Sequence, residues 1–300
     1  MLKSAIKIIS VYATLYCAVG AVAQELYDIP LKPNPGDRLS IDYVHERNRN
    51  GQIVVVDFDA EIIVDAAYDD RFVATWTTHS ARIGDLEIVS SDPQAVDYLL
   101  GVPIRYIADM DGTPVRIEDK NRMLDSMFDG QLFEMRSEQE IASVGAFFDS
   151  LSEEALAQLF LKVPTYMALC QGVSLQLGEW MGATVQTPSP IGGAPVAADI
   201  SYLLESFDSG TSTAHIEYRM GLDPESAKQM TMALMRQAGV DDESTMAEVA
   251  GTNVERNDTA ACDVDIDHGW VEEITFFNEL KVPGQFQSER FVVSAQLHSQ

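Results

Sequence analysis

Hydrophobic and polar residues alternate over long stretches of the chain. The clearest stretch covers 54–64, where every second position is apolar and acidic residues occupy three of the positions between. Because successive side chains of a strand point to opposite faces of a sheet, this pattern predicts a long strand with one face on a core and the other in water. The apolar positions are Val54, Val56, Phe58, Ala60, Ile62 and Val64.

Turn sequences between such stretches predict β-hairpins. Asn50-Gly51 separates 54–64 from another alternating stretch at 39–47, and Asn-Gly is typical of a two-residue hairpin turn. Adjacent hairpins of this kind build antiparallel meanders. Three more hairpins are predicted around Asp111-Gly112, Asp208-Ser209-Gly210 and Asp267-His268-Gly269, with single strands over about 71–80 and 286–297.

Helix signals concentrate between the two groups of strands. They predict helices over 119–128, over 137–149 and from Ser152 to Lys162, the last ending before Pro164. A short helix is predicted within 92–101, and another helix within 223–239. This order predicts an α+β fold, a strongly curved antiparallel sheet of half-barrel-like meanders with the central helical block packed on its concave face.

The first 23 residues have the pattern of a secretory signal peptide. Two lysines precede an apolar run that ends in Ala21-Val22-Ala23, so we expect cleavage before Gln24. The alternatives are an uncleaved N-terminal anchor and a lipoprotein acylated on Cys17. We therefore expect a periplasmic or secreted protein with no integral membrane span after cleavage. The expected divisions are 1–23 as signal peptide and 24–300 as one exported domain, with N-terminal strands at 24–118, the helical block at 119–163, and C-terminal strands with one helix at 164–300.

Two cysteines remain after removal of residues 1–23, Cys170 and Cys262. Thiols oxidise in the periplasm and outside the cell, so an even pair there predicts one disulfide bond. The alternative is two separate buried thiols that behave as small hydrophobic side chains.

Charge excludes some classes of partner. The 300 residues carry a formal net charge of −27 with a pI near 4.3, so the main electrostatic interaction with nucleic acid or anionic lipid would be repulsive. The chain also lacks the usual hydrolase, zinc-protease and nucleotide-binding motifs, and its five histidines are isolated from one another. We therefore expect a protein that binds no nucleic acid, is not an enzyme and needs no cofactor.

An acidic triplet, Asp263, Asp265 and Asp267, resembles the beginning of a calcium-binding loop. The loop of an EF-hand needs glycine at its sixth position and glutamate at its twelfth, but His268 and Ile274 occupy these positions. We therefore expect a solvated strand face and no metal site, with a weak divalent-cation site as the alternative.

The order of several short elements resembles a group of exported bacterial β-rich proteins of uncharacterised function. The general plan is also similar to the lipoprotein-carrier half-barrels of the LolA and LolB type. That resemblance implies a space for acyl chains between a curved sheet and helices, and it assigns no site residues. The elements are Gly36-Asp37-Arg38-Leu39-Ser40, 102–106, 111–115, Gly178-Glu179-Trp180 and 265–270.

These observations together predict a periplasmic, non-enzymatic protein that binds a hydrophobic ligand in a groove between sheet and helices. The ligand would be a lipid, or a lipidated or partner-protein segment. The alternative is a structural or assembly factor of the cell envelope that has no ligand cavity and contacts an envelope protein. The candidate groove residues are Val54, Phe58, Ile62 and Trp76.

Overall fold

The computed structural model describes residues 26–92, 98–128, 145–146, 148–149, 151–187, 196–226, 228–229, 232, 255–282 and 285–298. The expected signal peptide lies outside these residues. So do most of the helices expected within 92–101, 137–149 and 223–239.

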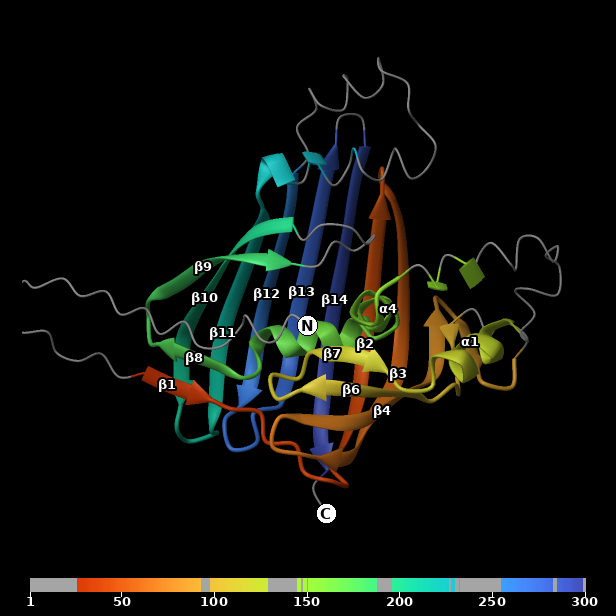
Figure 1. The fold of residues 1–300 in the computed structure, drawn as a ribbon, viewed down its shortest axis with the longest axis horizontal. Coiled ribbons are helices and arrows are strands. Elements are labelled where there is room, and N and C mark those ends of the chain that lie inside the picture. The colour runs from red at the N-terminus through yellow and green to blue at the C-terminus, as the bar shows by residue number, and fades with distance from the viewer. Residues whose placement is uncertain are drawn as a thin grey trace, which may run out of the picture.

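One antiparallel sheet of twelve strands dominates the fold (Figure 1). Eleven of its strands follow the order β7-β6-β4-β3-β2-β14-β13-β12-β11-β10-β9, and the twelfth, β5, pairs with β4. A separate two-stranded sheet pairs β1 with β8. The α+β class is therefore confirmed. The strands are β1 (Leu26–Ile29), β2 (Arg38–Arg49), β3 (Gln52–Ala67), β4 (Arg71–Ile83), β5 (Leu86–Val89), β6 (Ile104–Asp109), β7 (Pro114–Ile117), β8 (Val173–Gln176), β9 (Trp180–Thr187), β10 (Val196–Asp208), β11 (Thr213–Leu222), β12 (Glu255–Asp265), β13 (Val271–Val282) and β14 (Gln285–His298).

The predicted hairpins are present, and the Asn50-Gly51 turn has the expected geometry. Asn50 and Gly51 both have positive φ angles, 50° and 87°, as a tight turn between right-twisted strands requires. The pairing of β14 with β2 joins the two ends of the chain in one sheet, from Gln287 opposite Arg49 to His298 opposite Arg38. The sequence pattern did not predict this pairing, nor the strands β1, β5, β8 and β9.

The sheet is open, and the expected strong curvature is wrong. Strands β7 and β9 form its two edges, and the sheet twists so that β4 and β6 run across the direction of β10 to β14 (Figure 1). A sheet curls toward a barrel only when its strands are steeply tilted and staggered. Alternation within single strands carries no information on that stagger.

The described helices are α1 (Lys120–Phe128), α4 (Glu153–Phe160), α5 (Lys162–Met167) and the 3-10 turn η2 (Ala168–Cys170). Ser152 caps α4 as expected, since its hydroxyl accepts a hydrogen bond from the backbone N–H of Ala155 at 3.1 Å. The helix expected to reach Lys162 instead ends before Leu161. Pro164 lies in the first turn of α5, where its missing N–H removes no intrahelical bond.

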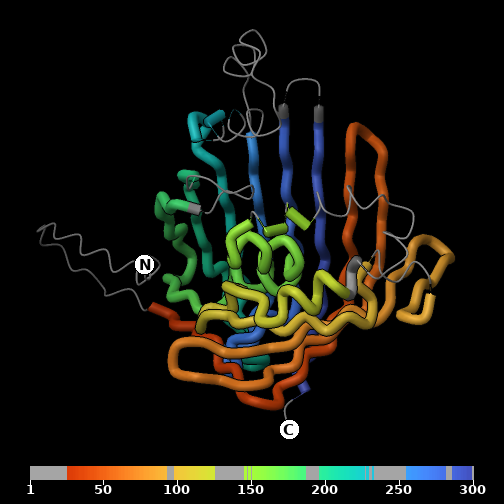
Figure 2. The backbone as a smooth tube through the Cα atoms, turned by 45° about the vertical axis from the view of Figure 1, so that its right-hand side comes forward, coloured from red at the N-terminus to blue at the C-terminus, as the bar shows by residue number. Residues whose placement is uncertain are grey.

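Helices α4 and α5 lie against one face of the sheet, which we call the inner face (Figure 2). Tyr166 of α5 stacks on Phe276 of β13 with ring centroids 3.9 Å apart, and Val163 and Met167 of the same helix are buried. Within the described ranges, no helix is long and apolar enough to cross a membrane.

A disulfide bond joins η2 to β12. Cys170 and Cys262 are bonded, with Cα atoms 6.5 Å apart, and they lie 92 positions apart in sequence. Both residues are buried in the main core. The predicted disulfide is therefore confirmed, and it holds the end of the helical segment against the centre of the sheet.

Candidate functional site

The inner face of the sheet changes from apolar to charged along the strands. Phe276, Phe291 and His45 lie opposite one another on β13, β14 and β2, and Tyr166 places this row on the inner face. Residues two positions further along each strand share that face. One neighbouring row is Ile274, Val293, Tyr43 and Phe58, and the row on the other side is Asp258, Asn278, Glu289 and Arg47.

A cavity of about 140 Å³ lies between the inner face and helices α4 and α5. Its walls come from five strands, both helices and the segment that precedes β6. Most of the wall is aromatic or aliphatic, while His45 and Lys162 add a polar side. The lining residues are Tyr43, His45, Phe58, Trp76, Thr78, Tyr98, Leu99, Ile104, Leu159, Phe160, Lys162, Val163 and Phe291.

The four predicted groove residues do not come together at one place. Phe58 and Trp76 line the cavity. Ile62 is only 1% exposed and packs in the main core outside the cavity wall. Val54 faces the same side of the sheet but lies opposite Arg47 in the charged row, and it is 53% exposed. The alternating pattern identified the correct face, but not the part of the face that the helices cover.

Aromatic rings hold one another in place around the cavity. Tyr43 stacks on Phe58 with ring centroids 4.6 Å apart, and Tyr98 meets the edge of Phe58 at 6.0 Å. The Nε1–H of Trp76 donates a hydrogen bond to the hydroxyl of Thr78 at 3.2 Å. Burial raises the pKa of Tyr43, and its hydrogen bond to Thr78 opposes this only in part. This part of the wall is therefore an ordered aromatic surface, in which the polar atoms of Tyr43 and Trp76 are paired with Thr78.

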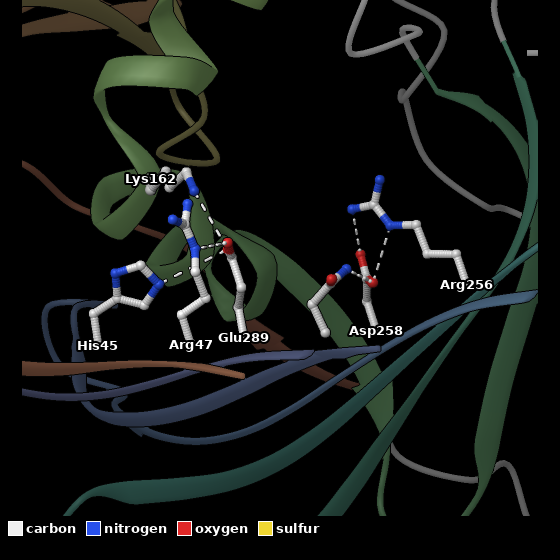
Figure 3. Close-up of polar contacts among 7 residues, drawn as sticks. His45, Arg47, Lys162, Arg256, Asp258 and Glu289 are labelled. Atoms are coloured by element: carbon white, nitrogen blue, oxygen red, sulfur yellow. Dashed lines mark hydrogen bonds and ion pairs between the residues drawn. The ribbon is translucent and has the colours of Figure 1, made fainter. Parts of the chain in front are cut away.

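Glu289 of β14 lies at the centre of a charged cluster beside the cavity (Figure 3). Its carboxylate accepts hydrogen bonds from Nζ of Lys162 and from Nε of Arg47, each at 3.3 Å. Nε2 of His45 lies 3.9 Å from the same carboxylate. Burial alone would raise the pKa of Glu289, but Lys162, His45 and Arg47 together lower it, so Glu289 is ionised at neutral pH.

His45 is neutral at pH 7. Burial lowers its pKa to about 4, and the charges of Lys162 and Arg47 add to this effect while Glu289 opposes it. The ring stacks on Phe291 with centroids 4.1 Å apart. Its Nε2 atom is buried and has no hydrogen-bond partner among the described residues.

A second buried carboxylate, Asp258 of β12, lies in the same row of the inner face (Figure 3). It accepts two hydrogen bonds from the guanidinium of Arg256, at 2.8 and 3.1 Å, and one from the side-chain amide of Asn278. A bidentate pair of this kind neutralises both charges, so Asp258 and Arg256 leave no surplus charge on the row.

Sequence reasoning missed most of the wall and the whole charged cluster. Tyr43 and His45 continue the alternation of 39–47, so the period-two signal could have identified them. Lys162 comes from a helix and Glu289 from the last strand, and no local pattern connects the two.

The acidic triplet lies elsewhere, at the end of β12. Asp263 pairs with His215 on β11, while the Asp265 carboxylate accepts one hydrogen bond from the backbone N–H of Asp267 and contacts His268. In the described part of the chain, no group of three His, Cys, Asp or Glu side chains is placed to hold a metal ion.

Comparison with known proteins adds little to this geometry. No family model matches the chain, and no curated protein matches it. The chain is similar to a solved structure titled "Lipid-protein interactions in lipovitellin", with 11% sequence identity and a TM-score of 0.41. The match covers 89% of this chain and 25% of that one, so this chain spans about a quarter of that protein's length. A likeness this weak carries no argument about function.

Proposed function

We propose that this protein is a non-enzymatic binding protein that takes the apolar part of a ligand into the cavity between the inner face and helices α4 and α5. The observation that carries the proposal is the cavity itself, whose wall includes Phe58 and Trp76. Aromatic side chains offer a large contact area at low entropic cost.

The size of the cavity limits what enters it. Pockets for whole drug-sized ligands have volumes of roughly 300–1,000 Å³, while an apolar cavity of about 150 Å³ is known to admit benzene. The 140 Å³ found here therefore suits one ring or the end of a hydrocarbon chain. In this proposal the remainder of the ligand lies outside the cavity, along the charged row of the inner face.

The proposed location is the periplasm or the cell exterior. The signal-peptide pattern of residues 1–23 supports export, and the Cys170–Cys262 disulfide is compatible with an oxidising compartment. The similarity to LolA- and LolB-type carriers also implies a space for acyl chains between a sheet and helices. We use that resemblance only as an analogy of overall architecture, because a similar fold does not fix function.

Binding of a neutral hydrophobic probe tests the proposal. We expect the exported protein to bind N-phenyl-1-naphthylamine and enhance its fluorescence. Because burying an aromatic ring contributes roughly 1.5–3 kcal/mol, Phe58→Ala should weaken binding by about tenfold or more. Val54→Ala on the same strand is the matched control, since Val54 is exposed and does not line the cavity.

Two results together would overturn the proposal. One is no probe binding by the parent protein. The other is native mass spectrometry of freshly exported protein that finds no co-purified lipid or other small hydrophobic molecule. That outcome would support the alternative of an envelope structural or assembly factor, which the small volume of the cavity favours.

A further inference from the structure

Two cations at the cavity share a single carboxylate. Glu289 accepts from both Lys162 and Arg47, and the side chains of these two residues are still 37% and 42% exposed. Lys162 also lines the cavity. Arg47 lies two positions beyond the cavity-lining His45 on the same face of β2, so both cations lie beside the cavity.

The charges in this region do not cancel. Arg47, Lys162 and Arg256 contribute three positive charges, Glu289 and Asp258 contribute two negative charges, and neutral His45 contributes none. Arg49, exposed and two positions beyond Arg47 on the same face of β2, adds a further positive charge. Among these described residues, positive charge is therefore in excess, in a chain whose net charge is −27. A local excess of positive charge attracts anionic groups.

We propose that the ligand is a long-chain carboxylate, with its hydrocarbon end in the aromatic cavity and its carboxylate bound by Lys162 and Arg47. The inference rests on the proposed function and names the class of ligand. It requires a negative charge on the head group, because positive charge is in excess on this part of the inner face.

The geometry of Glu289 shows that a carboxylate fits between these two cations. Its two oxygens each accept one hydrogen bond, from Lys162 and from Arg47. An ammonium group has three N–H donors and a guanidinium has five, so both can bind a second carboxylate at the same time. Among the described residues, Arg47 contacts Glu289 through Nε, which leaves its two terminal NH₂ groups for the ligand.

The test compares one probe in charged and neutral form. We expect the exported protein to bind 11-(dansylamino)undecanoic acid about tenfold more tightly than its methyl ester at pH 7, with the preference falling as salt is added. The double substitution R47Q/K162Q should reduce the preference to within about twofold while the ester still binds. Arg38→Gln, on the same strand beside Glu61, is the matched control and should keep the full preference.

Removing the negative charge of Glu289 distinguishes recognition of the ligand's carboxylate from a purely structural role of the cluster. Glu289→Gln leaves both cations unopposed, so it should increase the preference for the acid over the ester. A purely structural cluster would show equal binding of acid and ester in every variant, which overturns the inference and leaves the proposed function standing. Binding of neither probe form overturns the inference, and it overturns the proposed function as well when native mass spectrometry finds no co-purified hydrophobic molecule.

Discussion

Glu289 and Lys162 lie 127 positions apart in sequence, yet their charged atoms are 3.3 Å apart. The contact links the last strand of the sheet to the first turn of α5. It places a buried carboxylate directly under the helix that closes the cavity, so the same pair contributes to the position of α5 and to the charge at the cavity mouth.

Replacing Glu289 should destabilise the protein at neutral pH. Glu289→Gln removes the charge that Lys162 and Arg47 share, and we expect the free energy of unfolding to fall by about 1–3 kcal/mol. Urea denaturation at pH 7 measures this change. Glu87→Gln, at an exposed position on β5, is the control and should be close to neutral.

The same glutamate should give an acid-dependent contribution to stability. The pKa of Glu289 is lowered in the folded protein, so its contribution is complete above the ordinary carboxyl pKa of about 4.3 and is lost as the pH falls below it. The difference in stability between the parent protein and Glu289→Gln should therefore shrink on acidification. An unchanged difference from pH 7 to pH 3 would contradict this assignment.

His45 should control stability in a separate pH range. Its pKa is about 4 in the folded state and about 6.5 in an unfolded chain, so between these values only the unfolded state binds the proton. The free energy of unfolding should fall by up to about 3 kcal/mol as the pH decreases through this range. His45→Phe, which retains the stacking on Phe291, should flatten the profile, while His298→Phe at an exposed position should not.

Reduction of the Cys170–Cys262 disulfide should cost about 4 kcal/mol of stability, because the bond closes a loop of about 90 residues in the unfolded chain. The double substitution C170A/C262A should lower the free energy of unfolding by a similar amount. The denaturation midpoint of this variant should not change when dithiothreitol is added. A parent protein whose midpoint is the same with and without reductant would show that the bond does not form after export.

Two glycines with positive φ should differ in their tolerance of alanine. Gly51 and Gly269 have φ angles of 87° and 76°, but a Cβ on Gly51 meets nothing within 4 Å, whereas on Gly269 it would lie 2.2 Å from the carbonyl oxygen of Pro30. Gly51→Ala should cost about 1–2 kcal/mol from backbone strain alone. Gly269→Ala should cost clearly more, since the backbone must move, and equal thermal shifts would contradict this.

The sequence alone determined the local structure of the molecule. Alternation over 39–47 and 54–64 with Asn50-Gly51 between them predicted the first hairpin, and Ser152 marked the start of α4. The two cysteines predicted the disulfide. The hairpin and the helix start depend on side-chain periodicity and turn conformation over short distances, which a sequence displays directly. The disulfide followed from the number of cysteines and the expected compartment.

Only the tertiary structure decided the site. The pairing of β14 with β2 brings Phe291 and Glu289 beside His45 and Arg47, although some 240 residues separate them in sequence. Alternation assigns Val54, Phe58 and Ile62 to one face, but burial separates them because α4 and α5 cover only part of that face. Strand order, open edges and the position of α5 arise from contacts between distant segments, and no local pattern of hydrophobic and polar residues encodes those contacts.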